Sequence, residues 1–274
     1  MKDSDCVLFL QWCLPKLRLR WPGFRKVRRQ VCRRIDRRIA ALGLRDLPAY
    51  RAYLEGHPAE WRVLDALCRI SISRFYRDKG VFQCLERDVL PDLARAVALR
   101  GEADVRCWSA GCAAGEEPYT LAVLWRLRLA HQFPALGLKI LATDADPHAI
   151  ERAVEGCFPA GNLKELPEEL LAAALVPAAH GFRVREAFRA PVTFLEQDLR
   201  VAAPDERFHL VLCRNLAFTY FDDALQRETL RRIEERLSLE GALVIGRRER
   251  LPEGASGFEL WGRAAEIYRR VSGP

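Results

Sequence analysis

The chain has 274 residues, of which 50% are hydrophobic and 30% are charged, with a formal net charge of +7 at pH 7. This composition is typical of a globular protein and excludes a disordered one, and the length suits a large domain with a smaller one beside it. The longest uncharged stretch near the N-terminus, residues 6–15, is too short to span a bilayer and lacks the features of a signal peptide. We therefore expect a cytoplasmic protein without membrane insertion.

The nine cysteines show no regular spacing, and no Cys-x-x-Cys pair occurs. In a chain of this size they do not describe a disulfide framework, and they do not indicate a structural zinc site. We expect reduced thiols and no bound metal.

Residues 16–38 concentrate the positive charge, with eleven Lys and Arg side chains against a single acid, Asp36. Within this block, apolar residues recur every fourth position from Val27 to Ile39, which predicts an amphipathic helix that ends at Gly43. Three interpretations remain open: docking on an acidic protein, a solvated cationic face, and contact with nucleic acid. No recognition-helix or RNA-binding signature supports the third.

Further helices over residues 47–54 and 59–67 complete a small helical domain, which we predict to cover residues 1–80. After residue 105 the pattern changes to strands that alternate with helices, which indicates βαβ units in a mostly parallel sheet. The predicted strands cover residues 105–112, 138–146, 192–199, 208–216 and 241–246, and the predicted helices cover residues 116–130, 147–156 and 222–237. We predict a sheet domain over residues 81–274, with a small subdomain inserted at about residues 156–190.

A loop of small residues follows the first predicted strand and leads into Glu116 and Glu117. Such a loop lets a ligand approach the backbone closely, at the sheet edge where doubly wound proteins bind ligands. It lacks the glycine pattern and the lysine of phosphate-binding loops, and its acids would repel a pyrophosphate. The acids suit a cationic or hydroxyl-rich ligand, although a favourable interaction with the helix dipole explains them equally well.

Polar side chains also follow the later strands. Asp144 is our choice for a ribose-binding acid, because Asp146 stands where it can cap the next helix. Asp198 could accept a hydrogen bond from an adenine amino group or simply form a turn. The pair Arg214 and Asn215 could meet a carboxylate or an amide. A glycine loop with an acid at each of two successive strand ends is similar to an S-adenosylmethionine site.

The chain resembles the CheR-type chemotaxis receptor methyltransferases, which are protein-glutamate O-methyltransferases, over about residues 24–246. The resemblance is carried by the segments SISRFYRD, WSAGCAAGEEPYT, ATDAD, NLKELP, CRN…YFD and GALVIG. It implies an α/β fold with a Rossmann-like S-adenosylmethionine-dependent methyltransferase sheet domain, a small inserted β-subdomain and a small all-α N-terminal domain. It also implies S-adenosyl-L-methionine as methyl donor, S-adenosyl-L-homocysteine as product, and a glutamate on a cytoplasmic helix of a chemoreceptor as acceptor.

The resemblance assigns roles to individual residues. The implied cofactor-binding residues are Ser71, Ser73, Arg77, Glu117, Asp144, Asp198, Leu199, Arg214 and Asn215. Arg77 and Tyr220 would face the acceptor carboxylate. The implied docking residues for an acidic receptor helix are Arg25, Arg28, Arg29 and Arg33. No general base is needed, because an ionised carboxylate is already a nucleophile and a sulfonium methyl group is already activated.

The chain departs from the family at three places. Ser71 and Asp198 stand where the family often has Asn, and the link between Asn215 and Tyr220 is one residue longer than usual. These departures keep two alternatives open. One is a methyltransferase of the same fold that acts on a small molecule or an unrelated protein, and the other is a non-catalytic module that binds the cofactor.

Overall fold

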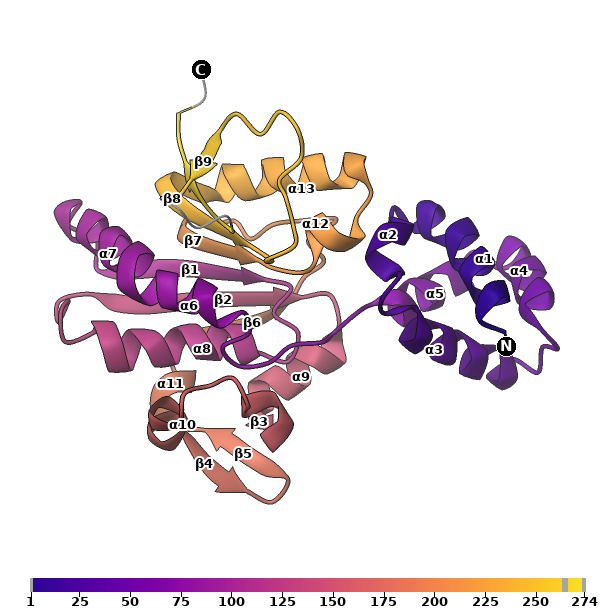
Figure 1. The fold of residues 1–274 in the computed structure, drawn as a ribbon, viewed down its shortest axis with the longest axis horizontal. Helices are drawn as coiled ribbons and strands as arrows, with labels where there is room; N and C mark the ends of the chain where they lie inside the picture. Colours follow the sequence, from indigo (N-terminus) through magenta and orange to yellow (C-terminus); the bar gives the residue numbers. More distant parts are fainter. Residues whose placement is uncertain (1, 263–265, 273–274) are drawn as a thin grey trace. The chain divides into compact units, whose positions relative to one another are not determined.

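The computed structural model describes residues 2–262 and 266–272, which form two compact units (Figure 1). The helical unit holds the chain up to Ile70 together with residues 219–226, and the sheet unit holds residues 71–218 and the chain from residue 227 onward. We expected the boundary at residue 80. The division falls earlier because the backbone after Ser71 is bonded to the sheet unit. The amide of Phe75 donates to the carbonyl of Asn162 at 2.9 Å, and the amide of Tyr76 donates to Oγ1 of Thr120 at 3.1 Å.

The helical unit is built on amphipathic helices with a common apolar core. Its elements are α1 (Asp3–Cys13), η1 (Leu14–Leu17), α2 (Trp21–Phe24), α3 (Arg28–Ala41), α4 (Leu47–Gly56) and α5 (Glu60–Cys68). The predicted apolar stripe of α3 is buried, with Val31 and Ile35 fully covered. Asp46 caps α4, because its carboxylate accepts a hydrogen bond from the amide of Ala49 at 2.9 Å.

A disulfide joins Cys6 on α1 to Cys32 on α3, with the two Cα atoms 6.0 Å apart. The expectation of reduced thiols is therefore wrong for this pair, whereas the other seven cysteines are free. The pairing depends on how α1 packs against α3. A separation of 26 residues along the chain does not reveal that packing.

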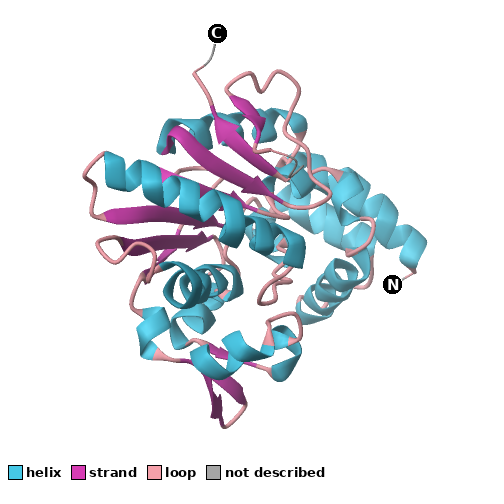
Figure 2. Ribbon diagram, turned by 60° about the vertical axis from the view of Figure 1, so that its left-hand side comes forward, coloured by secondary structure: helices cyan, strands magenta, loops and turns pink. Residues whose placement is uncertain are grey.

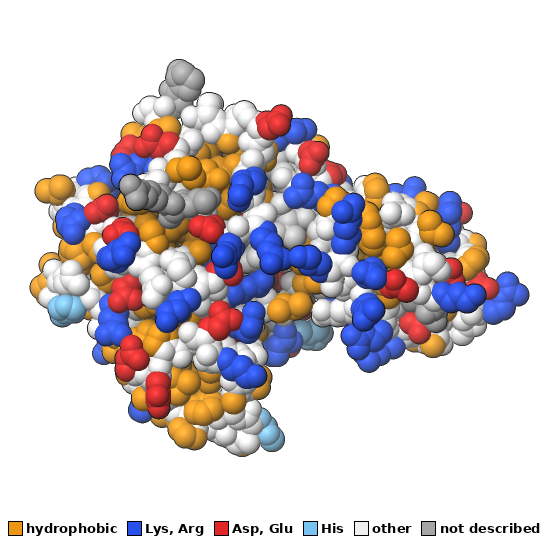
Figure 3. Space-filling model, in the orientation of Figure 1, with side chains coloured by type: hydrophobic (Ala, Val, Ile, Leu, Met, Phe, Trp, Pro, Cys, Tyr) orange, Lys and Arg blue, Asp and Glu red, His pale blue; other side chains and the backbone are white. Residues whose placement is uncertain are grey.

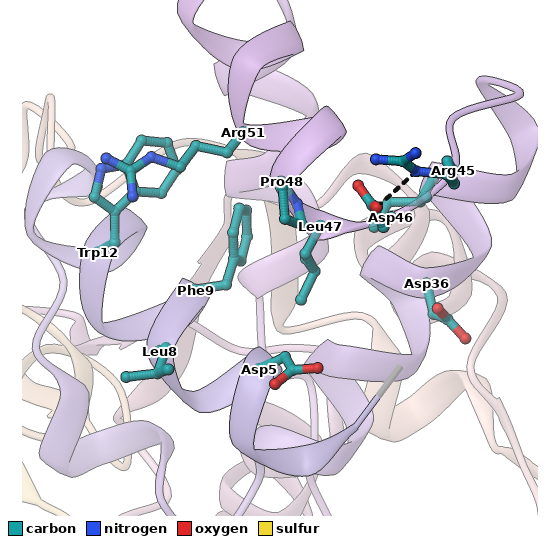
Figure 4. A pocket seen from close by; sticks show the side chains of 11 residues that line it. Asp5, Leu8, Phe9, Trp12, Asp36, Arg45, Asp46, Leu47, Pro48 and Arg51 are labelled. Atoms are coloured by element: carbon teal, nitrogen blue, oxygen red, sulfur yellow. Dashed lines mark hydrogen bonds and ion pairs between the residues drawn. The ribbon is translucent and has the colours of Figure 1, made fainter.

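The N-terminal helix α1 also forms one wall of a cavity of about 490 Å³, together with α3 and α4 (Figure 4). Phe9 and Leu47 supply apolar lining. On one side the guanidinium carbon of Arg51 lies 4.4 Å from the ring centroid of Trp12. The first 22 residues are thus an integral part of the helical unit.

The sheet unit contains a seven-stranded sheet in the order β6-β2-β1-β7-β8-β10-β9, with helices on both faces (Figure 2). Its strands are β1 (Asp104–Ala110), β2 (Gly137–Asp144), β6 (Val192–Glu196), β7 (Phe208–Cys213), β8 (Leu237–Ile245), β9 (Phe258–Leu260) and β10 (Ile267–Arg270). The five strands from β6 to β8 run parallel, and β10 is antiparallel to both β8 and β9. Because parallel strands end at one edge, the loops after β1, β2, β6, β7 and β8 gather there.

The helices of this unit include several that the sequence patterns did not predict. Its helical elements are α6 (Lys79–Cys84), η2 (Leu85–Val89), α7 (Leu90–Leu99), α8 (Glu116–Leu124), η3 (Trp125–Leu129), α9 (Pro147–Glu155), α12 (Ala217–Tyr220) and α13 (Asp223–Arg236). The continuous helical segment from α6 to α7 was not predicted from the sequence. The last two residues of α12 and the first turn of α13 belong to the helical unit.

A small subdomain is inserted between α9 and β6, where the irregular sequence predicted one. Its three-stranded antiparallel sheet has the order β3-β5-β4. The elements are β3 (Cys157–Phe158), η4 (Ala160–Leu163), α10 (Glu168–Ala174), β4 (Leu175–Ala178), β5 (Gly181–Val184) and α11 (Glu186–Arg189). The predicted α/β class with an inserted β-subdomain and an all-α N-terminal part is confirmed.

Candidate cofactor and acceptor site

The loop after β1 has a backbone shape that only small residues tolerate. Gly111 and Gly115 have φ values of +79° and +94°, and Ala113 has a φ of 50°. A Cβ atom on Gly115 would lie 3.1 Å from Cβ of Ala153 and 3.2 Å from Cζ of Phe194. The loop therefore needs glycine for both its left-handed conformation and its tight packing. This geometry brings the start of α8 close to the end of β2.

Asp144, at the end of β2, is hydrogen-bonded to this loop. Its Oδ2 accepts the amide of Ala113 at 2.9 Å, and its Oδ1 accepts the amide of Asp146 at 2.9 Å. A carboxylate has about four lone-pair sites, so it can accept several donors at once, including ribose hydroxyls. Asp146 caps α9 by accepting the amide of His148 at 3.1 Å. The structure thus supports the division of roles between these two acids, and ribose binding by Asp144 stays a prediction.

Arg214, which follows β7, is buried, with 2% of its side chain exposed. Its Nη1 donates to Oε2 of Glu117 at 3.1 Å, and its Nη2 donates to Oδ2 of Asp78 at 2.9 Å and to the carbonyl of Arg77 at 2.8 Å. Ser109 on β1 donates to the other oxygen of Glu117 at 2.7 Å. The carboxylates that Arg214 meets therefore belong to the protein itself, and its guanidinium ties three segments of the site together.

The neighbouring Asn215 depends on an acid that we did not single out from the sequence. Oε2 of Glu249 accepts the amide of Asn215 at 2.8 Å and the amide of Gly246 at 2.6 Å. Only 3% of Glu249 is exposed. This carboxylate clamps the ends of β7 and β8 and supports the φ of 56° at Asn215. In the sequence, Glu249 could have been noticed as the single acid among three arginines in residues 247–250, just after the last predicted strand.

The segment 71–77 leads into α6 through a strained backbone. Tyr76 and Asp78 have φ values of 59° and 61°. Such conformations cost non-glycine residues on the order of 1–3 kcal/mol each and persist only where the surroundings enforce them. Ser71 and Ser73 are half-buried, and Nη1 of Arg77 donates to the carbonyl of Ile72 at 2.6 Å.

The third strand end, after β6, carries Asp198 and Leu199. Both carboxylate oxygens of Asp198 accept hydrogen bonds from Arg200, at 3.0 Å from Nε and 2.7 Å from Nη2. Leu199 is buried. An adenine amino group would share the Asp198 carboxylate with this arginine.

Tyr220 belongs to the helical unit, whereas the nine residues implied for the cofactor belong to the sheet unit. Its ring centroid lies 5.1 Å from that of Phe24, and its carbonyl accepts the amide of Arg20 at 2.8 Å. A Cβ atom on Gly23 would lie 2.4 Å from the carbonyl oxygen of Thr219. The lengthened link after Asn215 thus ends in a helix that packs tightly against residues 20–24.

Most of the predicted docking residues, which lie on α3 and on the turn before it, face solvent. Lys and Arg side chains are spread over the visible face of the helical unit (Figure 3). Arg25, Arg29 and Arg33 are exposed. Arg28 instead forms a bidentate ion pair with Asp3. Its Nε donates to Oδ1 at 3.0 Å, and its Nη2 donates to Oδ2 at 2.9 Å. The charge of Arg28 is therefore partly neutralised by the protein's own N-terminal helix.

The doubly wound sheet, the glycine loop after β1, the acids at the start of α8 and Asp144 at the end of β2 form the arrangement typical of an S-adenosylmethionine-binding methyltransferase domain, and the family match supports this class. Two family descriptions match the chain: "CheR methyltransferase, SAM binding domain" over residues 71–266, and "CheR methyltransferase, all-alpha domain" over residues 26–67. The chain belongs to the CheR methyltransferase family.

Three curated relatives illustrate the similarity. The "Chemotaxis protein methyltransferase" of Salmonella typhimurium is 31% identical over 252 residues, covering 86% of this chain and 81% of the relative. The protein of the same name in Borreliella burgdorferi is 28% identical over 224 residues, covering 78% and 79%. An "Uncharacterized 104.1 kDa protein" of Rhodobacter capsulatus is 32% identical over 246 residues, covering 88% of this chain, and the chain spans a quarter of that relative's length.

None of the described helices is both long and apolar enough to cross a membrane. No group of three or more His, Cys, Asp or Glu side chains in the described parts of the chain could hold a metal ion.

Proposed function

We propose that this protein transfers a methyl group from S-adenosyl-L-methionine to the side-chain carboxylate of a glutamate in a chemoreceptor-like protein. The proposal of a cofactor pocket is carried by two acids, Asp144 at the end of β2 and Glu117 in the first turn of α8, which both accept hydrogen bonds from groups of the protein. Carboxylates at this edge suit the two ribose hydroxyls and the ammonium group of the cofactor. The acceptor half is supported by the relatives named chemotaxis protein methyltransferases.

In this proposal the protein mainly positions the reactants. The cofactor supplies an electrophilic methyl group on a positively charged sulfur, and a glutamate carboxylate oxygen takes it up as a methyl ester. Arg77 pairs with the acceptor carboxylate, orients it and keeps it ionised. Ser71 and Ser73 contact the amino-acid end of the cofactor, Asp198 and Leu199 frame the adenine, and Tyr220 faces the acceptor.

The exposed arginines on α3 and on the turn before it provide the docking surface for the acidic acceptor protein. Arg25, Arg29 and Arg33 attract a negatively charged helix and raise the association rate at low salt. Arg28 contributes less than the other three, because Asp3 already pairs with it.

The cofactor half is tested by calorimetric titration with S-adenosyl-L-homocysteine. We expect micromolar binding to the full chain, loss of binding in Asp144→Ala, and retained binding in the control Asp146→Ala, which removes only a helix cap. Absent binding to the folded wild-type protein, or full binding to Asp144→Ala, would refute the proposed pocket.

The acceptor half is tested by transfer of a labelled methyl group to an acidic receptor segment. Base-labile labelling of glutamates is the expected result, since methyl esters hydrolyse in base. If the protein binds the cofactor product but labels no such segment, the receptor assignment is wrong and a small molecule or another protein is the acceptor.

A further inference from the structure

Glu116, the first residue of α8, is a buried acid that the proposed chemistry does not use. Only 2% of it is exposed. Its Oε1 accepts a hydrogen bond from Nδ2 of Asn162 at 2.6 Å, whereas its Oε2 has no hydrogen-bond partner among the described residues. Burial raises the pKa of Glu116 above its ordinary value of 4.5, whereas the side chains of Asn162 and Ser73 act in the opposite direction. A buried, half-satisfied carboxylate is costly, so its presence calls for a compensating role.

Asn162, the partner of Glu116, lies on η4 of the inserted subdomain and forms hydrogen bonds with two segments outside the subdomain. Its side chain reaches the start of α8, and its backbone carbonyl accepts the amide of Phe75 at 2.9 Å. Two more contacts join the subdomain to the same segment. The ring centroids of Phe75 and Phe158 are 4.8 Å apart, and Arg74 forms an ion pair with Glu165 at 2.9 Å.

The start of α8 holds this segment from the other side. Oγ1 of Thr120 donates to the carbonyl of Glu116 at 2.6 Å and accepts the amide of Tyr76 at 3.1 Å. The next residue of the helix, Glu117, pairs with Arg214, which in turn binds the carbonyl of Arg77. Segment 71–77 is therefore fixed by α8, η4 and Arg214, and its strained backbone at Tyr76 depends on them.

We propose that Glu116 and Asn162 are positioning residues that couple the inserted subdomain to the cofactor pocket, by setting the place of segment 71–77. This inference rests on the proposed role of that segment in cofactor binding. Because coupling between sites is reciprocal, a partner that shifts the subdomain changes cofactor affinity, and the bound cofactor changes the affinity for that partner.

The test is a double-mutant cycle on the full chain, read as the dissociation constant of S-adenosyl-L-homocysteine. We expect Asn162→Ala and Glu116→Ala each to weaken binding by about fivefold or more, and the double variant to be no weaker than the worse single variant. Glu116→Gln keeps the oxygen that Asn162 binds, so we expect its affinity within about twofold of the wild type.

The matched control is Arg183→Ala, an exposed change on β5 of the same subdomain, where Nε contacts Sγ of Cys157 at 3.1 Å. We expect it to leave the affinity unchanged. Unchanged affinity in both single alanine variants, or effects that simply multiply in the double variant, would overturn the coupling. Wild-type protein that binds no product would refute the proposed function instead, so the two failures are distinguishable.

Discussion

Replacement of Arg214 by Met should destabilise the sheet unit more than any surface change. The substitution removes three hydrogen bonds and leaves the carboxylates of Asp78 and Glu117 without their shared cation, although their side chains are only 25% and 12% exposed. Removing one partner of a buried ion pair typically costs about 3–5 kcal/mol. Because Glu117 and segment 71–77 lose a shared anchor, we also expect weaker binding of S-adenosyl-L-homocysteine.

The geometry makes two companion variants informative. Arg214→Lys keeps the charge, but one ammonium group cannot span both carboxylates. We therefore expect the free energy of unfolding to fall by about 1–3 kcal/mol. Combining Arg214→Met with Glu117→Gln removes one of the two unpaired charges. The double variant should therefore be more stable than Arg214→Met alone.

The assay is urea denaturation followed by far-ultraviolet circular dichroism, together with hydrogen exchange at the amides of β1, which reports on the sheet unit alone. Arg106→Met is the control, because that arginine forms a partly exposed pair with Glu102 at 2.7 Å and should cost no more than about 1 kcal/mol. Equal decreases in unfolding free energy for Arg214→Met and Arg106→Met would show that the ion pairs of Arg214 with Asp78 and Glu117 do not stabilise the site.

Three further changes have definite expected outcomes. Glu249→Ala leaves the amides of Asn215 and Gly246 without their acceptor and should cost about 2–4 kcal/mol in denaturation; a loss below about 1 kcal/mol would contradict the clamp. Cys32→Ser opens a 26-residue disulfide loop and should cost about 3.5 kcal/mol, and a reductant should destabilise the wild type but not the variant. A hydrogen bond from Arg38 lowers the pKa of Glu60 below 4.5. That stabilisation is present above pH 4.5 and is lost as the pH falls through the folded-state pKa; a Glu60→Gln variant should show a flatter acid dependence, and an identical one would disprove the assignment.

Much of the architecture could be predicted from the sequence, because it depends on local periodicity. Apolar residues spaced for helices and strands predicted the basic helix and the five parallel strands of the sheet. The edge that carries the loop after β1 and Asp144 after β2 could also be placed, since parallel strands end at one edge of the sheet. The family was indicated by a resemblance of particular segments, such as WSAGCAAGEEPYT and CRN…YFD.

Only the tertiary structure decided which partners the polar side chains take. Arg214 meets Glu117 and Asp78 across 97 and 136 residues of chain, and Glu249 reaches back to Asn215 across 34. Cys6 meets Cys32 only because α1 packs on α3. Periodicity reports which face of an element is buried, but a hydrogen bond or a disulfide depends on distances in space that the spacing of residues along the chain does not contain.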